Sequence, residues 1–130
     1  FLMNRILNIV SQFYGEKNKS TAADEIVSNI ITFVTENISN YELSVDMIAE
    51  YFHYSRFYLT HLFKNYSGIS LKEYITNKRL SIIKELLIST SLKFNEIADK
   101  VGFLNSVYLS KWFKDNVGES MTFYRNTNKK

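Results

Sequence analysis

The chain has 130 residues, of which 45% are hydrophobic and 22% charged, as expected for one globular domain or two very small ones. It contains no Cys and only two His, which excludes disulfides, thiol catalysis and cysteine-based zinc sites. The absence of Pro and the presence of only four Gly favour helices. No apolar run is long enough for a membrane span. The net charge of +3 is compatible with an acidic partner.

Apolar spacing predicts a helix over residues 1–14 and another over about residues 22–37, separated by a polar linker. Thr21 is the expected N-cap of the second helix, with Asp24 reaching back to it from the first turn. Residues 1–20 are interpreted as the end of an upstream domain or as a dimer-forming segment. Packing of this segment on the body of the domain explains the same apolar stripe equally well.

Six more helices are predicted from N-cap candidates, apolar stripes and Gly stops, over about residues 45–52, 56–66, 71–88, 94–101, 106–116 and 121–125. The expected N-caps are Ser44, Ser55, Ser70 and Ser120, and the expected stops are Gly68 and Gly118. Leu43 and Ile48 stand at the two positions of a hydrophobic staple around the first of these caps. The tail from residue 126 should be loose. No segment has the pattern of a strand, so the predicted fold class is all-α.

The second half of the chain copies the first at a spacing of 50 residues. The matched residues are Tyr58-Leu59 with Tyr108-Leu109, Phe63-Lys64 with Phe113-Lys114, and Gly68, Ser70 and Tyr74 with Gly118, Ser120 and Tyr124. Each copy has a short helix, a tight turn and a longer helix, which is the pattern of a helix-turn-helix. His53 stands where the second copy has Gly102, which predicts a turn position with positive φ and a structural role for this histidine.

Each copy also contains a window without acidic residues. No Asp or Glu occurs between Glu50 and Glu73, or between Asp99 and Asp115, whereas Lys or Arg residues occur in both windows. Such windows in a chain of nearly balanced charge are expected where a surface meets phosphate, and chance on a sparsely charged surface is the alternative. A single pair of helices is usually plain packing, so it is the coincidence of the repeat with the two windows that favours DNA binding.

The longer helix of each copy is predicted to expose a face suited to a major groove. In the first, the expected buried set is Leu59, Leu62, Phe63 and Tyr66, with Tyr58 at its edge, and the outward set is Phe57, Thr60, His61 and Lys64. In the second, the expected buried set is Tyr108, Leu109, Trp112 and Phe113, and the outward set is Val107, Ser110, Lys111 and Lys114. Neither outward set has a carboxylate, and both have groups that bond base edges or touch a thymine methyl. Ordinary solvated positions are the plainer explanation for the hydroxyls and lysines.

Over about residues 22–125 the chain resembles the DNA-binding domain of the AraC/XylS family of bacterial transcription regulators. The family signature is carried by Ile97-Ala98, Val101-Gly102-Phe103, Tyr108-Leu109-Ser110, Phe113-Lys114, Gly118 and Tyr124-Arg125. Two positions depart from the family pattern. Met121 replaces the usual Pro, which weakens one helix start slightly, and Lys93 replaces a better helix cap at a cost of about 1 kcal/mol.

The resemblance implies a first helix-turn-helix subdomain over residues 21–70, a linker helix over 71–89 and a second subdomain over 90–130. Recognition helices over about 56–66 and 106–116 would enter successive major grooves. The implied DNA-binding residues are Arg56, Phe57, Thr60 and His61 in the first helix, Ser106, Val107, Ser110 and Lys111 in the second, and Asn105, Lys64 and Lys114 nearer the phosphate backbone.

Most family members activate transcription by touching RNA polymerase. The expected partners are therefore promoter DNA, RNA polymerase and, through residues 1–14 or an upstream domain, a second copy, in the bacterial cytoplasm at the nucleoid. No cofactor or metal is expected. The alternatives are a helical protein-interaction module or anti-activator that does not bind DNA, a small helical enzyme and, among DNA-binding proteins, a repressor. An enzyme is disfavoured because, with no Cys, two separated His and scattered acidic residues, the sequence shows no constellation for a nucleophile, a carboxylate pair or a metal cluster.

Overall fold

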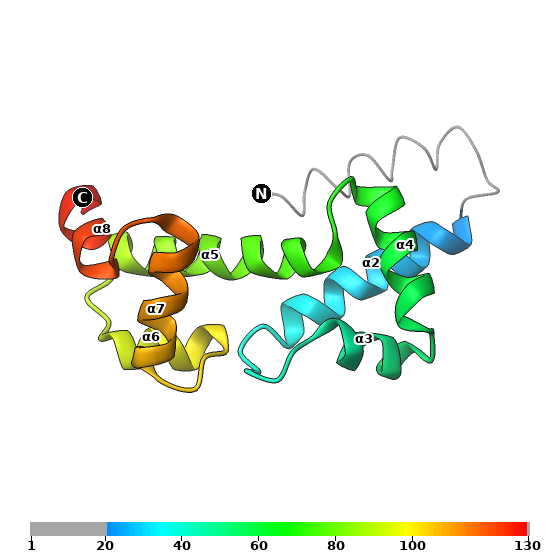
Figure 1. Ribbon diagram of the computed structural model, residues 1–130, viewed down its shortest axis with the longest axis horizontal. Coiled ribbons are helices and arrows are strands. Elements are labelled where there is room, and N and C mark those ends of the chain that lie inside the picture. The colour runs from blue at the N-terminus through cyan, green and yellow to red at the C-terminus, as the bar shows by residue number, and fades with distance from the viewer. Residues whose placement is uncertain (1–20, 130) are drawn as a thin grey trace. The chain divides into compact units, whose positions relative to one another are not determined.

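The computed structural model describes residues 21–129, and within them it contains helices and no strand (Figure 1). The helices are α2 (Thr21–Glu36), α3 (Val45–Phe52), α4 (Arg56–Ser67), α5 (Leu71–Ser89), α6 (Phe94–Val101), α7 (Ser106–Val117) and α8 (Met121–Asn128). The all-α prediction is therefore confirmed, while the helix predicted over residues 1–14 lies outside the described residues. The predicted bounds of α3 and α6 are confirmed at both ends.

The helix α8 runs to Asn128, so the prediction of a loose tail from residue 126 is wrong. Two polar side chains explain the extra turn. The Thr127 hydroxyl donates to the Phe123 carbonyl at 2.8 Å, and the Asn128 amide donates to the Tyr124 carbonyl at 2.9 Å. These bonds satisfy backbone carbonyls at a helix end that would otherwise face water, which stabilises the last turn.

The described residues form two compact units. One contains residues 21–37 and 43–75, and the other contains residues 38–42 and 76–129. The helix α5 is continuous in sequence and contributes its first turn to one unit and its remainder to the other.

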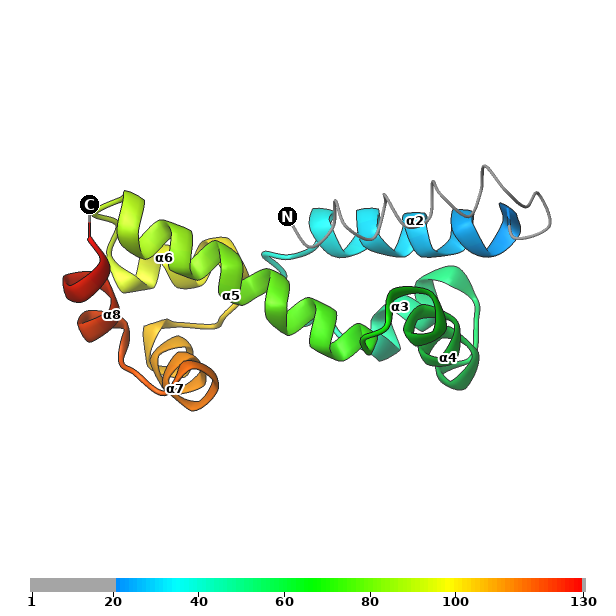
Figure 2. The ribbon, with the colours of Figure 1, turned by 90° about the horizontal axis from the view of Figure 1, so that it is seen from above.

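In the first unit, α2, α3 and α4 pack together and enclose an apolar core (Figure 2). The fully or almost fully buried side chains of this core are Val27, Ile30, Ile31, Val34, Leu43, Val45, Ile48, Ala49, Leu59, Phe63, Leu71, Tyr74 and Ile75. The predicted start of α3 is confirmed, because the Ser44 hydroxyl accepts a hydrogen bond from the Met47 amide at 3.1 Å and Leu43 and Ile48 are both buried.

The turn between α3 and α4 confirms the predicted role of His53. This residue ends α3 in the left-handed region, with φ 62° and ψ 37°. Its counterpart in the second copy, Gly102, ends α6 with φ 84° and ψ 38°. The two turns therefore have the same backbone conformation, and only the residue type differs.

The second unit is built around a core from α5, α6, α7 and α8, whose buried members are Ile83, Leu87, Ile97, Ala98, Val101, Leu109, Phe113 and Met121. Arg79 of α5 is 9% exposed and donates to the carbonyls of Ile38 (3.1 Å) and Asn40 (2.8 Å). Its guanidinium also lies 5.7 Å from the centre of the Phe103 ring. Burial lowers the pKa of Arg79, and the carbonyl bonds offset the cost of burying its charge. These bonds hold residues 38–42 to the second unit.

The sequence makes specific predictions for the starts of α2, α6 and α8. The Asp24 carboxylate is buried and has no hydrogen-bond partner among the described residues, so the predicted capping box at the start of α2 is wrong. Lys93 makes no side-chain cap for α6, as expected, but its amide donates to the Glu96 carboxylate at 2.8 Å, which supplies half of a capping box. Met121, where the family has Pro, is 2% exposed and belongs to the second core.

Candidate nucleic-acid interface

The two candidate recognition helices, α4 and α7, have the same construction at both ends. Ser55 caps α4 by accepting from the Tyr58 amide at 3.0 Å, and Gly68 ends it with φ 86°. Asn105 caps α7 by accepting from the Val107 and Tyr108 amides at 3.0 and 3.1 Å. The predicted ends at Gly68 and Gly118 are confirmed, whereas sequence reasoning missed the capping role of Asn105.

A second bond joins the two helices of each copy at the start of the longer one. In the second copy, the Ser106 amide donates to the Asn95 side-chain oxygen at 3.0 Å. In the first copy, the Arg56 guanidinium donates to the Asp46 carboxylate at 2.6 Å. Asp46 and Asn95 occupy corresponding positions on the shorter helix, and Arg56 and Ser106 are both first residues of the longer helix. The repeat therefore extends to a contact between the two helices at this point, made by a side chain in the first copy and by a backbone amide in the second.

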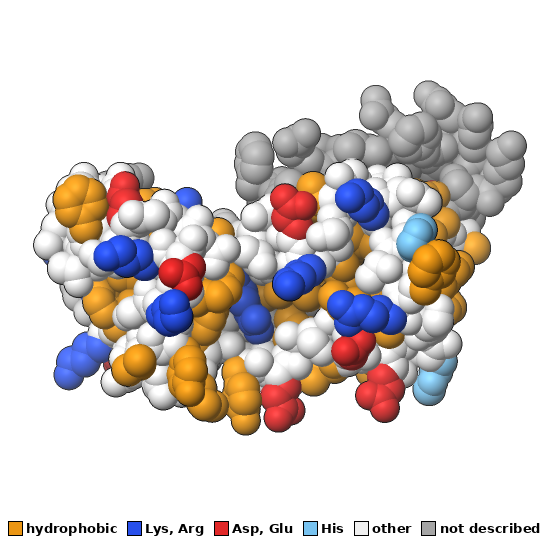
Figure 3. Space-filling model, viewed as in Figure 1, with side chains coloured by type: hydrophobic (Ala, Val, Ile, Leu, Met, Phe, Trp, Pro, Cys, Tyr) orange, Lys and Arg blue, Asp and Glu red, His pale blue; other side chains and the backbone are white. Residues whose placement is uncertain are grey.

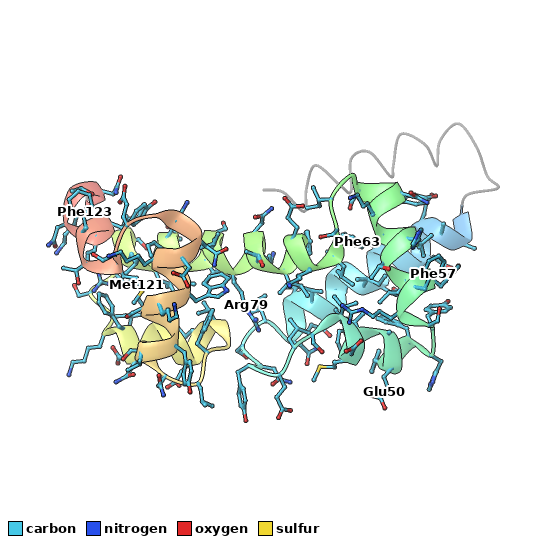
Figure 4. The ribbon with its side chains drawn as sticks, in the orientation of Figure 1. Glu50, Phe57, Phe63, Arg79, Met121 and Phe123 are labelled. Carbon is cyan, nitrogen blue, oxygen red and sulfur yellow. The ribbon has the colours of Figure 1, made fainter. Side chains whose placement is uncertain are left out.

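The predicted division of α4 into a buried and an outward face is confirmed except at Thr60, which was expected to face outward and is half-buried. Leu59 and Phe63 are fully buried, and Leu62 and Tyr66 are half-buried. On the opposite side, Phe57 is 71% exposed, and His61 and Lys64 are exposed. Figure 4 labels Phe57, an exposed aromatic residue of this helix, and Phe63, a buried one.

The predicted outward face of α7 is also confirmed, but one predicted core residue is not buried. Val107 is 74% exposed, and Ser110, Lys111 and Lys114 are exposed as well. Tyr108, which was expected in the core, is 60% exposed. The prediction for Tyr108 is wrong because its side chain is turned by about 100° from that of its neighbour Leu109, which occupies the centre of the buried face.

On each recognition helix a cationic side chain pairs with a carboxylate, whereas the sequence predicted outward faces without carboxylates. Besides the pair of Arg56 with Asp46, the Lys111 ammonium lies 3.2 Å from the Asp115 carboxylate, four residues further along α7. All four side chains are more than half exposed, so each pair is worth no more than about 1 kcal/mol and opens readily. In Figure 3, red acidic side chains accordingly lie close to several of the blue Lys and Arg side chains.

The uncharged polar groups of α4 are already oriented by its backbone. The Thr60 hydroxyl, which is half-buried, donates to the carbonyls of Arg56 (2.9 Å) and Phe57 (3.1 Å), which leaves its oxygen as an acceptor. The His61 ring stacks on the Phe57 ring with 4.0 Å between centroids. The face thus presents prearranged acceptors and an aromatic surface beside the Arg56 and Lys64 cations.

Residues 21–129 contain no group of three or more His, Cys, Asp or Glu side chains placed to hold a metal ion. Within the same range, none of the helices combines the length and the apolar character that a membrane crossing needs.

Comparison with known proteins agrees with this geometry. The Helix-turn-helix domain family model matches residues 48–127, which include both candidate recognition helices. The HTH-type transcriptional activator AarP of Providencia stuartii is 33% identical over 100 residues, covering 77% of this chain and 73% of AarP. The C-terminal domain of AraT, a response regulator from Geobacillus stearothermophilus, has 33% identity and a TM-score of 0.75, covering 81% of this chain and 87% of that domain.

A third relative extends over most of the chain. The HTH-type transcriptional regulator YfiF of Bacillus subtilis is 29% identical over 126 residues, which cover 92% of this chain. The same alignment covers only 40% of YfiF, so the chain spans well under half of that regulator's length.

Proposed function

The chain belongs to the AraC/XylS family of helix-turn-helix transcription regulators, and we propose that it binds a specific promoter sequence by inserting α4 and α7 into successive major grooves. The family membership makes it the DNA-binding domain of a regulator. The proposal that both helices read DNA rests on one observation, which is that the same helix arrangement occurs twice in the chain. Each copy presents a capped helix whose buried Leu and Phe fix its rotation and whose opposite face is exposed.

The two reading faces carry different chemistry. On α4 the proposed base-reading residues are Arg56, Phe57, Thr60 and His61, and on α7 they are Ser106, Val107, Ser110 and Lys111. Lys64, Lys114 and Asn105 are assigned to the phosphate backbone, where Asn105 offers its amide hydrogens because its oxygen caps α7. Since the two faces differ, the site for one copy of the chain should not be palindromic.

We assign the linker between the two readers to α5. Its 19 residues correspond to about 28 Å of helix, against roughly 34 Å for one turn of DNA. If the two recognition helices are held less than one turn apart, the DNA must bend, at a cost on the order of 1–6 kcal/mol.

The proposed role is transcription activation by contact with RNA polymerase beside the promoter, in the bacterial cytoplasm at the nucleoid. This rests on the family and on relatives such as AarP, which is named as a transcriptional activator. Residues 1–14 or a domain upstream are proposed to bring a second copy.

Selection of bound duplexes from a random pool tests the proposal and yields the site, its length and its symmetry together. We expect a non-palindromic site covering about two helical turns, with an affinity that falls as salt rises. Lys64→Ala should weaken binding to all sequences about equally and reduce the salt slope by about one. A chain that binds no duplex at low salt would instead be a protein-interaction module, and the proposal would be wrong.

A further inference from the structure

The most definite chemical feature of the α4 face is the pairing of His61 with Phe57. The two residues are one helical turn apart, and their rings stack with an interplanar angle of 34° at 4.0 Å between centroids. His61 Nδ1 lies 3.0 Å from the Phe57 carbonyl oxygen. Both side chains are exposed, so the stack faces outward from the domain rather than filling its core.

This contact determines what the imidazole offers to a ligand. A carbonyl oxygen only accepts hydrogen bonds, so His61 Nδ1 carries the proton and donates it to Phe57. In the neutral ring the other nitrogen, Nε2, is then an acceptor. The backbone of α4 therefore fixes both the orientation of the ring and the tautomer, and the outer edge of His61 seeks a hydrogen-bond donor.

We propose that this pair reads one A·T base pair, with the adenine N6 amino group donating to His61 Nε2 and the thymine methyl contacting the Phe57 ring. In the major groove, only adenine N6 and cytosine N4 are donors on base edges. Only thymine carries a C5 methyl, so an A·T pair supplies both groups and a C·G pair supplies one. The inference rests on the proposed function and adds a base identity to it.

The second copy has different side chains at the two equivalent positions. Val107 and Lys111 stand 50 residues after Phe57 and His61 and are exposed on α7. Val107 keeps an apolar group, but Lys111 presents an ammonium, which only donates. Its base partners are the O6 and N7 acceptors of guanine. The repeat therefore places an acceptor on one recognition helix and a donor at the equivalent point of the other.

Base analogues in the selected duplex test the proposal atom by atom. Replacing the contacted adenine by purine, which lacks N6, should weaken binding of the 130-residue chain about three- to tenfold. Replacing the paired thymine by uracil, which lacks the methyl, should weaken it about fourfold. His61→Ala should abolish the response to purine, and Phe57→Ala should abolish the response to uracil. Because both side chains are exposed, neither variant should unfold the domain.

Two further variants test which base position and which base pair His61 reads. Lys111→Ala is the matched control, which should change the preference at a different base position and leave the purine response intact. His61→Lys should convert the preferred A·T pair to G·C, because it replaces an acceptor by a donor. If the chain binds its duplex but His61→Ala keeps the full purine response, the base assignment is wrong while the proposed function stands. If no duplex is bound at all, the proposed function fails first.

Discussion

Tyr74 shows how a single buried polar atom affects stability. Its side chain is fully buried against Phe63, with 5.5 Å between ring centroids, and its hydroxyl has no hydrogen-bond partner among the described residues. Burial also raises the pKa of Tyr74 from 10.0 to about 12. An unpartnered buried hydroxyl costs free energy that a Phe ring of nearly the same shape does not.

Tyr74→Phe should therefore raise the free energy of unfolding by about 1 kcal/mol near neutral pH, measured by denaturant titration. The pKa shift adds a test at alkaline pH. Because the folded-state pKa lies above the unfolded one, the wild type keeps its full stability below about pH 10. Between about pH 10 and about pH 12 it should lose roughly 2–3 kcal/mol that the variant does not lose. Tyr124→Phe, at the half-buried equivalent position, is the control and should show a smaller difference.

The glycines that end α6 and α7 have similar positive φ angles, 84° and 92°, but different surroundings. A Cβ on Gly102 would lie 2.5 Å from Arg79 Nη2 and 2.5 Å from the Ile38 carbonyl oxygen, whereas a Cβ on Gly118 meets no atom within 4 Å. Gly118→Ala should therefore lower the free energy of unfolding by only about 1–2 kcal/mol, which is the cost of placing Ala in the left-handed conformation. Gly102→Ala should cost about 3 kcal/mol or more, because it also displaces the Arg79 bonds. Equal losses in thermal unfolding would show that the packing around Arg79 contributes nothing.

At the level of whole helices, the boundaries follow from residues that can be recognised in the sequence. Serine caps predict the starts of α3 and α4, and left-handed stops together with the 50-residue repeat predict the ends of α3, α4, α6 and α7, because these signals act within four residues of the helix end. His53 was predictable only through the repeat, by its alignment with Gly102.

Some missed features are local, such as the Asn105 cap of α7 and the last turn of α8, but others depend on tertiary contacts. The pairing of Arg56 with Asp46 joins residues ten positions apart on two helices, and Arg79 bonds to carbonyls about forty positions away. The sequence therefore predicts which residues of the candidate site face outward, but only the structure shows how the side chains of Arg56 and His61 are oriented.

Helix α6 offers a test of capping, because Lys93 stands at its N-cap without a side-chain acceptor. Lys93→Ser should raise the free energy of unfolding by about 0.5–1 kcal/mol, since a hydroxyl there accepts from the first-turn amides while Glu96 still bonds the residue 93 amide. Ser44→Ala, which removes an existing cap of the same type from α3, should lower it by a similar amount. If Lys93→Ser leaves the midpoint of denaturation unchanged, the Glu96 bond already satisfies this helix start.

For the whole molecule, the central question is whether both recognition helices act on one DNA site. If α4 and α7 read one site through the helical linker α5, the base pairs that each reads must keep a fixed angular relation around the duplex. Inserting about five base pairs between the two half-sites turns one of them by about half a turn and should lower affinity at least tenfold, because only one helix then reaches its groove. An exchange of the same number of base pairs without insertion is the control and should change affinity little. An inserted site bound as tightly as the original would mean that one helix-turn-helix supplies all of the sequence-specific binding.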